Sequence, residues 1–551
     1  MTSPVYELAD RHVERWADLD PVGATYLGIA GRDHAWTDWS PDGHAARADL
    51  ARATLAELAA LDDTSDADRV ARLVMEERLG SELALHEART WSTDLNVIAC
   101  PAVDVADVFD LADLSTPESA EAWATRLERV PEVCDAVRVS LRSGLDADDT
   151  AARRQAERTG AQVVERAGSF RSLADQATDP ALVERLRAAG EAAAAAYDSL
   201  GRWLTGDYAS AARPDDAAGR DRYGLFLQAF LGAAADVDEA YTWGWQRVRE
   251  LHDEMAVVGE QILPGAGLAE VLHHVEHESD FAVVGTAALR DWAQEHTDRM
   301  IEVFGRDHFD IAPAIRDCEV KVGPSGGAAA PHYVGPAEDG SRPGSVWYPD
   351  LGADHRFALW GQVTTANHEG VPGHHLQVAQ LVQGPAEVSR FQSTIAWTSG
   401  HGEGWALYAE RLCHELGLLD RPDAVLGFLA AAQLRAVRVV IDIGVHCGLP
   451  VPDDAVFRPG QSWTWDLAFD LAKTMTGEDD KVLSSEIDRY FGWPGQAPSY
   501  ALGEREWLAA RSAARDAAGA SFDAKAFHTA ALDLGPVGLD ILRSEVVRAV
   551  A

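Results

Sequence analysis

The stretch that organises this chain is Ala366-Asn367-His368-Glu369-Gly370-Val371-Pro372-Gly373-His374-His375-Leu376-Gln377. It places three imidazoles and a carboxylate within eight residues, with apolar residues close by. Histidine nitrogens are common zinc ligands, and a neighbouring glutamate can take the proton from a zinc-bound water. The stretch therefore predicts a zinc site built on helical sequence.

The spacing within this stretch differs from the common zinc-peptidase motif HExxH, in which two histidines share one helical face. Position i+4 from His368 is Pro372, which lacks the N–H that would bond the His368 carbonyl, and Gly373 follows. We therefore expect the helix to kink or bulge here. In an ideal helix His374 points about 120° away from His368, whereas His375 returns to the same face about 10 Å further along. Both remain candidates for the second ligand.

A third protein ligand is expected further along the chain, because zinc hydrolases hold the metal with three side chains. Residues 399–410 open a helix, and Glu403 lies near its first turn, 35 positions beyond His368. Glu410 lies two turns along the same face and is the second candidate. Glu410 could instead hold a ligating histidine in place.

The next predicted helix, at about 423–448, carries Arg438, Asp442 and His446 at i, i+4 and i+8, among apolar residues. One helical face therefore presents a cation, a carboxylate and an imidazole in a row. In a functional interpretation, Asp442 positions Arg438 for substrate and His446 to donate to the developing oxyanion. A purely structural ionic network explains the same pattern.

Three further residues are candidates for substrate contact. The turn-rich link 489–500 is dense in aromatic and amide groups and contains Gln496, a candidate substrate-binding residue, and Tyr500, a candidate donor to the tetrahedral intermediate. A tyrosine packed beneath the loop is the alternative for Tyr500. Arg342 lies in a Gly/Pro turn and could face a substrate carboxylate or bond local carbonyls.

A second HxxxH spacing occurs at His273 and His277, which share a helical face. No comparable carboxylate motif follows it. Polar residues on the outer side of an amphipathic helix explain it adequately.

Composition bounds the class of protein. The 551 residues include 89 acidic and 48 basic side chains, a net charge of −41, which repels nucleic acid and anionic membrane. The five cysteines are scattered and form no CxxC pair, so neither a disulfide framework nor a thiolate zinc site is indicated. The N-terminus has no signal-like pattern, and no later run reaches the length expected of a membrane span. We therefore expect a cytoplasmic protein without membrane or nucleic-acid partners.

Helical periodicity dominates the chain, so we predict a mainly α fold: a large multi-helix body with a deep central cleft. Residues 96–110 break the period and predict an irregular connection. Residues 318–322 and then 337–348 predict a strand, a turn and a strand, a small β element before the metal-binding helix. We expect an N-terminal helical region at 1–310 and a catalytic region at 311–551, joined in one continuous body.

Five blocks carry a resemblance to a known family: DGSRPG at 339–344, HEGVPGHHLQ at 368–377, EGWALYAE at 403–410, RVVIDIGVH at 438–446 and PGQAPSY at 494–500. In this order they resemble the bacterial family catalogued as domain of unknown function 885. That family is similar in its core to helical zinc peptidases of the thermolysin and Taq-carboxypeptidase types. The resemblance implies a mostly helical fold with a deep cleft, one zinc ion and amide hydrolysis. It also implies His368, His374 and Glu403 as ligands and Glu369 as the base.

Together these observations predict a zinc metallopeptidase acting on short peptides, with a carboxypeptidase preference if Arg342 or Arg438 binds a free carboxylate. A non-catalytic metal-dependent binding protein is one alternative, and a hydrolase of a non-peptide amide metabolite is another. The oligomeric state is left open, with a homodimer as one option.

Overall fold

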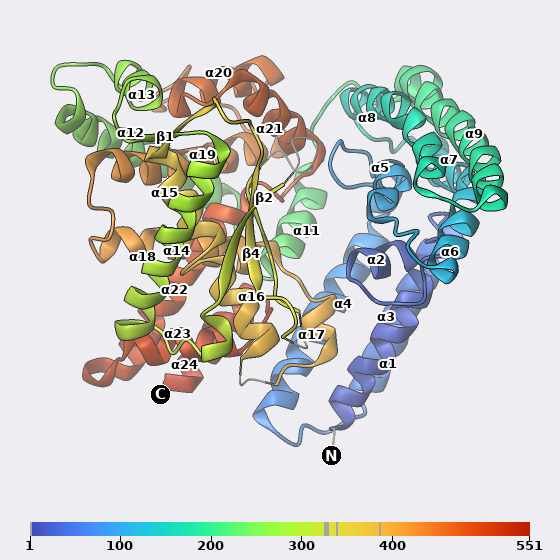
Figure 1. The fold of residues 1–551 in the computed structure, drawn as a ribbon, viewed down its shortest axis with the longest axis horizontal. Helices are drawn as coiled ribbons and strands as arrows, with labels where there is room; N and C mark the ends of the chain where they lie inside the picture. Colours follow the sequence, from blue (N-terminus) through green and yellow to red (C-terminus); the bar gives the residue numbers. More distant parts are fainter. Residues whose placement is uncertain (1–2, 324–329, 338–339, 385–386, 551) are drawn as a thin grey trace. The chain divides into compact units, whose positions relative to one another are not determined.

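A computed structural model of the chain describes residues 3–323, 330–337, 340–384 and 387–550. The mainly α prediction is confirmed: helices make up most of the described chain, and its strands form two small sheets (Figure 1). The chain divides into two compact units. The first comprises Met1–Phe226, Val445–Gly448 and Ser485–Pro494, and the second comprises Leu227–Gly444, Leu449–Ser484 and Gly495–Ala551. The division near 226 lies well before the expected boundary at 310.

All the regular elements of the first unit are helices, among the residues that the structure describes. Its helices are α1 (Pro4–Leu19), α2 (Pro21–Tyr26), α3 (Pro41–Leu58), α4 (Asp66–Glu87), α5 (Pro101–Asp107), α6 (Pro117–Glu128), α7 (Val130–Asp146), α8 (Arg153–Arg166), α9 (Pro180–Trp203) and α10 (Ala209–Ala211). Several begin in the same way, because a polar residue accepts a backbone N–H of the first turn and proline follows it. Ser3, Asp20, Ser40, Thr116 and Asp179 are these capping residues. Helix α5 corrects the prediction of an irregular segment at 96–110.

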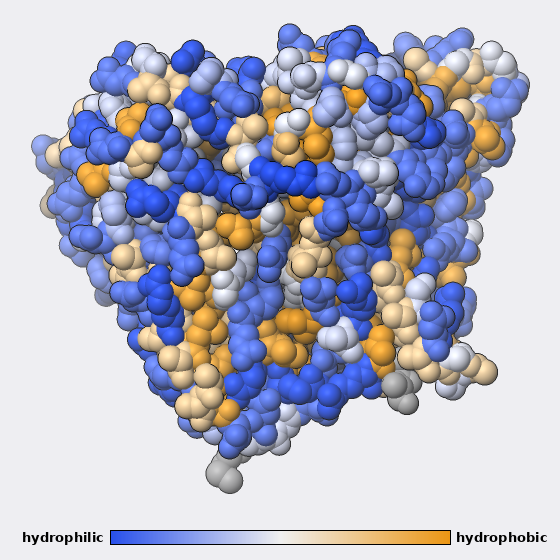
Figure 2. Space-filling view, turned by 180° about the vertical axis from the view of Figure 1, so that it is seen from behind, coloured by the Kyte–Doolittle hydropathy of each residue, from blue (hydrophilic) through white to orange (hydrophobic). Residues whose placement is uncertain are grey.

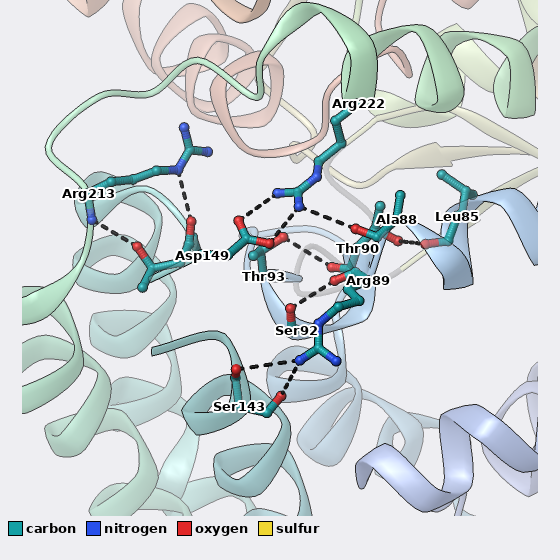
Figure 3. Close-up of polar contacts among 12 residues, drawn as sticks. Leu85, Ala88, Arg89, Thr90, Ser92, Thr93, Ser143, Asp149, Arg213 and Arg222 are labelled. Atoms are coloured by element: carbon teal, nitrogen blue, oxygen red, sulfur yellow. Dashed lines mark hydrogen bonds and ion pairs between the residues drawn. The ribbon is translucent and has the colours of Figure 1, made fainter. Parts of the chain in front are cut away.

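Loops of the first unit are fixed by arginines that bond backbone carbonyls and carboxylates (Figure 3). Arg222 donates to both carboxylate oxygens of Asp149, at 2.9 and 2.6 Å, and to the carbonyl of Ala88 at 3.3 Å. Arg89 has a left-handed backbone with φ of 54° and reaches Ser143. These contacts tie the end of α4 to the end of α7.

The second unit follows α11 (Arg220–Leu231), which leads into it. Its further helices are α12 (Val237–Ile262), α13 (Leu268–His277), α14 (Thr286–Asp307), α15 (Leu359–Glu369), α16 (His374–Gln383), α17 (Arg390–Thr394), α18 (Ser399–Glu415), α19 (Pro422–Cys447), α20 (Trp465–Thr476), α21 (Asp480–Gly492), α22 (Ser499–Ala518), α23 (Ala524–Asp533) and α24 (Leu539–Val550). Helices α19 and α21 also carry the short segments that belong to the first unit.

The strands of the second unit form two sheets. In the larger sheet β4 (Gly344–Pro349) lies between β2 (Cys318–Gly323), with which it is parallel, and β3 (His332–Val334), with which it is antiparallel. The smaller sheet pairs β1 (Ala282–Val284) with β5 (Arg356–Ala358). Of the prediction over 318–322 and 337–348, the two strands are confirmed as β2 and β4. Their parallel pairing, and the short strand β3 that comes between them in the sequence, were not predicted.

Two helices of the second unit approach each other closely through glycines. A Cβ atom on Gly404 of α18 would lie 2.5 Å from the carbonyl carbon of Gly503 in α22, and one on Gly503 would lie 2.2 Å from the carbonyl oxygen of Gly400. Only glycine permits this backbone contact. At the beginning of the two helices the hydroxyls of Ser399 and Ser499 lie 2.8 Å apart.

Helix α19 is the one helix of the described residues that is long and apolar enough to cross a membrane by length and composition. The expectation that no run reaches this length is therefore wrong. Within the protein, 78% of its most apolar window is buried, as in the central helix of a helical core.

Hydrophilic residues cover most of the face seen in Figure 2, where apolar residues form scattered groups. This surface agrees with the strongly acidic composition.

Candidate metal centre

The Pro-Gly sequence breaks the predicted helix into two. Helix α15 ends at Glu369, and α16 begins at His374. In the turn between them the Gly373 N–H bonds the carbonyl of Asn367 at 3.0 Å, and a Cβ atom on Gly373 would lie 2.0 Å from the carbonyl oxygen of His368. The break expected from Pro372 is therefore confirmed, and only glycine fits position 373.

A tryptophan from the neighbouring helix holds this turn. The indole N–H of Trp405, in α18, lies 3.1 Å from the carbonyl oxygen of Pro372 and 3.0 Å from that of Gly373. Trp405 is fully buried. Two carbonyls of the turn thus share one donor, and the Gly373 carbonyl also accepts the backbone N–H of Gln377 at 3.3 Å.

The turn brings three predicted ligands together. Glu403 Oε2 lies 3.4 Å from His368 Nε2 and 3.6 Å from His374 Nε2, and the ligand atoms of all three residues lie within 4.8 Å of one another. Atoms bound to one tetrahedral zinc at about 2.0–2.1 Å are separated by about 3.3 Å. The spacing of these atoms therefore suits a single cation.

His375 points elsewhere, although it is next in the chain. Its Nε2 lies 2.7 Å from the carbonyl oxygen of Ile315, and its Nδ1 lies 3.0 Å from the hydroxyl of Tyr333. Both ring nitrogens are thus used in hydrogen bonds, and the ring links α16 to β3. Between the two histidines that the sequence left open, the geometry places His374 at the centre.

Glu410 supports the first histidine from behind. Its Oε1 lies 2.8 Å from His368 Nδ1, which directs Nε2 of the same ring towards Glu403. The hydroxyl of Thr364 donates to the other carboxylate oxygen of Glu410, Oε2. The guanidinium of Arg435 lies 3.9 Å from Glu410 Oε1. A carboxylate bonded to the outer nitrogen of a ligating histidine is typical of zinc sites. The structure thus favours the supporting role over the ligand role for Glu410.

The residues present fit a cation. Glu403 Oε2 is buried and has no hydrogen-bond partner among the described residues. Burial opposes its charge, yet His368 and His374 hold the pKa of the Glu403 carboxyl well below its usual range. Burial likewise opposes protonation of His368, but Glu403 and Glu410 raise the pKa of that imidazole to about 10. These surroundings favour positive charge at their centre.

Glu369 stands outside the set of three. Its nearest carboxylate oxygen is 3.9 Å from His368 Nε2, and its side chain is 13% exposed. On β4, the buried hydroxyl of Tyr348 has no hydrogen-bond partner in the described chain, and Glu369 contributes to raising the pKa of this phenol, after burial itself. Tyr348 was not singled out in the sequence, because a strand pattern does not show what each face meets.

The candidate substrate residues fall into two groups. The guanidinium of Arg438 lies 4.6 Å from the centre of the Tyr500 ring, and Asp442 accepts the backbone N–H of Gly495 at 2.9 Å. Gln496 is buried in the same turn. This group adjoins the start of α22, next to α18. Arg342 instead is exposed and donates to the neighbouring Pro343 carbonyl at 3.4 Å, the local arrangement foreseen as its alternative.

His446 does not fit the predicted oxyanion role. Its Nε2 lies 2.8 Å from the carbonyl oxygen of Tyr490, and the N–H of Ala218 donates to its Nδ1 at 3.3 Å. Burial lowers the pKa of this imidazole to about 4, so its single ring hydrogen is given to Tyr490. No ring hydrogen remains for a substrate.

The His273 and His277 rings lie 4.6 Å apart on the exposed side of α13. They do not belong to a group of three potential ligands in the described ranges. The cysteines are free, and four of the five are buried. Neither feature forms a second candidate metal centre.

The fold and the site together define a mainly α protein with a candidate His-His-Glu metal centre at a broken helix. The chain belongs to the family described as bacterial protein of unknown function, DUF885, whose model matches residues 21–546. No curated protein matches the sequence.

Two solved structures share the fold. The crystal structure described as a putative lipoprotein from Colwellia psychrerythraea matches with a TM-score of 0.82 at 21% identity, covering 99% of this chain and 98% of that one. A putative lipoprotein of unknown function from Shewanella oneidensis matches with a TM-score of 0.77 at 16% identity, covering 98% and 99%.

Proposed function

We propose that this protein is a zinc-dependent peptidase acting on short peptides. The observation that carries the proposal is the convergence of His368, His374 and Glu403 around one point, with Glu403 Oε2 buried and without a hydrogen-bond partner in the described part of the chain. These three residues would hold the ion. When bound, zinc acts as a Lewis acid and lowers the pKa of a coordinated water.

The residues around this point have separable roles in the proposal. Glu369 follows a ligand in sequence but is not one of the three, so its carboxylate is available to accept a proton from the attacking water. Glu410 orients His368. Tyr500 and Tyr348 are the candidate donors to the oxygen that becomes negative as the carbonyl is attacked, and the Tyr348 hydroxyl has no partner within the described ranges. Arg438 would bind a free C-terminal carboxylate.

Elemental analysis of protein purified without added metal tests the site. We expect about one zinc in the wild type and in His375→Ala, and its loss in His368→Ala, His374→Ala and Glu403→Ala. His375→Ala is a matched control, because it removes an adjacent buried imidazole that faces away from the site. Zinc bound equally by all variants would refute the ligand set.

Activity is tested with dipeptides, blocked peptides and acyl-amides, each with and without chelator. Cleavage of peptides that chelator abolishes supports the peptidase. Cleavage of acyl-amides alone indicates a hydrolase of another amide, and zinc binding without any hydrolysis indicates a binding protein. Comparison of free and amidated C-termini tests the carboxypeptidase preference.

The location of the protein is a related proposal. The sequence favours the cytoplasm, whereas the titles of the two solved structures describe putative lipoproteins. Fractionation of the source cells, followed by detection with an antibody, separates a cytoplasmic protein from an exported or anchored one.

A further inference from the structure

Trp397 is an exposed aromatic residue just before α18, the helix that carries the candidate ligand Glu403. Its side chain is 49% exposed, and among the tryptophans, all of which lie in the described ranges, it alone is exposed. It precedes α18 by two residues, between the buried Ala396 and Thr398. The chain on both sides is therefore anchored while the indole remains accessible.

A glycine fixes where this indole lies. A Cβ atom on Gly402 would be 2.2 and 2.3 Å from two carbons of the six-membered ring of Trp397. Because real Cβ atoms do not approach so closely, the ring lies directly on the backbone of α18 at Gly402. Any side chain at this position would displace it.

Gly402 immediately precedes Glu403. Successive residues of a helix are separated by about 100° and 1.5 Å, so the indole lies beside the helical position that carries the candidate ligand. Glu403 in turn lies 3.4 to 3.6 Å from the two imidazoles. The indole therefore packs against the turn of α18 that carries the candidate ligand.

The indole itself decides which chemistry this surface suits. An indole face offers a large apolar area to an aromatic or aliphatic group. Single exposed apolar residues are ordinary on protein surfaces, but this one is held against the helix turn that carries a candidate ligand.

We propose that Trp397 forms the apolar wall of a subsite that binds the substrate side chain adjacent to the scissile bond. The favoured substrates are then peptides with an aromatic or large aliphatic residue at that position. This inference rests on the proposed metal-dependent function, and it specifies its substrate class.

Binding of two hydroxamates by calorimetry tests the subsite without requiring turnover. Phenylalanine hydroxamate and alanine hydroxamate carry the same metal-binding group and differ only in the side chain. For the zinc-loaded full chain we expect about tenfold tighter binding of the phenylalanine compound, as typical of apolar subsites. Trp397→Ala should reduce the ratio to about one while zinc content and the Kd of alanine hydroxamate stay unchanged.

Further variants keep the test decisive if Trp397→Ala fails to fold. Trp397→Phe should retain most of the preference, and Gly402→Ala should weaken it by displacing the ring. Leu416→Ala, which alters an exposed apolar residue at the other end of α18, should leave the ratio unchanged. A wild type without preference, or an unchanged ratio in folded, zinc-loaded Trp397→Ala, would overturn the inference.

The same measurements separate this inference from the proposed function. If the wild type holds no zinc, the metal centre fails and the subsite fails with it. If zinc binds and the hydroxamates are distinguished through Trp397, but no peptide in the panel is cleaved, then the peptidase proposal fails and the subsite stands.

Discussion

Three carboxylates lie around His368, and their contacts differ. Glu403 lies near the Nε2 atoms of both imidazoles, and Glu410 is hydrogen-bonded to Nδ1 of His368. Glu369 lies further away, 3.9 Å from His368 Nε2. Glu369→Gln should therefore retain zinc while kcat for peptide cleavage falls by about 10²- to 10⁴-fold, the usual contribution of a general base. Zinc analysis and steady-state kinetics on the same preparation check this. Loss of zinc along with activity would make Glu369 a ligand instead.

Glu410→Gln should weaken zinc binding without abolishing it. The change removes the charge that orients His368, and loss of such a partner typically costs about 10- to 100-fold in metal affinity. Competition with a chromogenic chelator measures the affinity. Glu415→Gln is the control, since Glu415 belongs to the same helix but pairs with Arg511. An unchanged affinity in Glu410→Gln would argue against the supporting role.

At the residue scale the sequence predicted most of what the structure brings together. The composition of 366–377 predicted a metal site, and the helix after 399 supplied Glu403 as a candidate ligand. The choice between His374 and His375 could not be made from the sequence, because it depends on the turn at Gly373. It also depends on the hydrogen bonds of the His375 ring to the Ile315 carbonyl and the Tyr333 hydroxyl, which come from distant segments. The backbone partners of His446, the Tyr490 carbonyl and the Ala218 N–H, could not be predicted either, since they come from distant segments.

The close pairing of α18 and α22 determines where Glu403 lies. Gly404→Ala would place a methyl group 2.5 Å from the backbone of Gly503, so the helices must separate. Overpacking of this kind costs about 1 to 3 kcal/mol of unfolding free energy. We also expect weaker zinc binding, because Glu403 adjoins the displaced residue. Urea unfolding and zinc analysis measure the two effects.

Gly80→Ala is the matched control for this experiment. Gly80 lies within α4, with nothing within 4 Å of its added Cβ atom. Alanine is favoured over glycine by about 1 kcal/mol inside a helix, so this variant should be more stable than the wild type. Equal effects of the two substitutions would show that the α18–α22 contact has no special role.

At the element scale, prediction succeeded where a local rule applied. Pro372 indicated the break between α15 and α16, and capping residues followed by proline marked helix starts in the first unit. Helix α5 was missed because it is only 7 residues long, too short for a helical period to stand out in the sequence. The parallel pairing of β2 with β4 was missed because strand partners are chosen by tertiary contacts.

In the molecule as a whole, buried histidines should contribute a loss of stability as the pH falls from about 6.5 towards 4. Burial lowers the pKa of His296 and His528 to about 4 and that of His401 to about 3. The unfolded chain, with histidines near 6.5, therefore binds more protons in this range, and the free energy of unfolding decreases with decreasing pH. Each fully titrating group changes it by about 1.4 kcal/mol per pH unit.

His528→Gln tests one of these groups, with Gln retaining a polar partner for the Tyr408 hydroxyl, which lies 2.7 Å from His528 Nε2. Its unfolding free energy, measured in urea at pH 7, 6 and 5, should depend on pH less steeply than that of the wild type. Identical slopes would mean that folding does not lower the pKa of His528. His273→Gln, a change at an exposed ring, should leave the slope unaltered.

The division of the chain was the least predictable feature at this scale. Helices α12 to α14 belong to the second unit, which contains the candidate metal centre. Their amphipathic pattern is like that of the helices before them, which belong to the first unit. Amphipathic periodicity indicates that a helix buries one face, but it does not identify the partner. The boundary near 226 is accordingly a property of packing.

Gln294 of α14 occupies the outer edge of β2. Its side-chain amide donates to the carbonyl of Cys318 at 2.9 Å and accepts the N–H of Val320 at 2.8 Å, as a neighbouring strand would. Unpaired strand edges promote association between chains. One glutamine thereby ends the sheet at this position, and a short β element inside a helical protein is kept from growing into an intermolecular one.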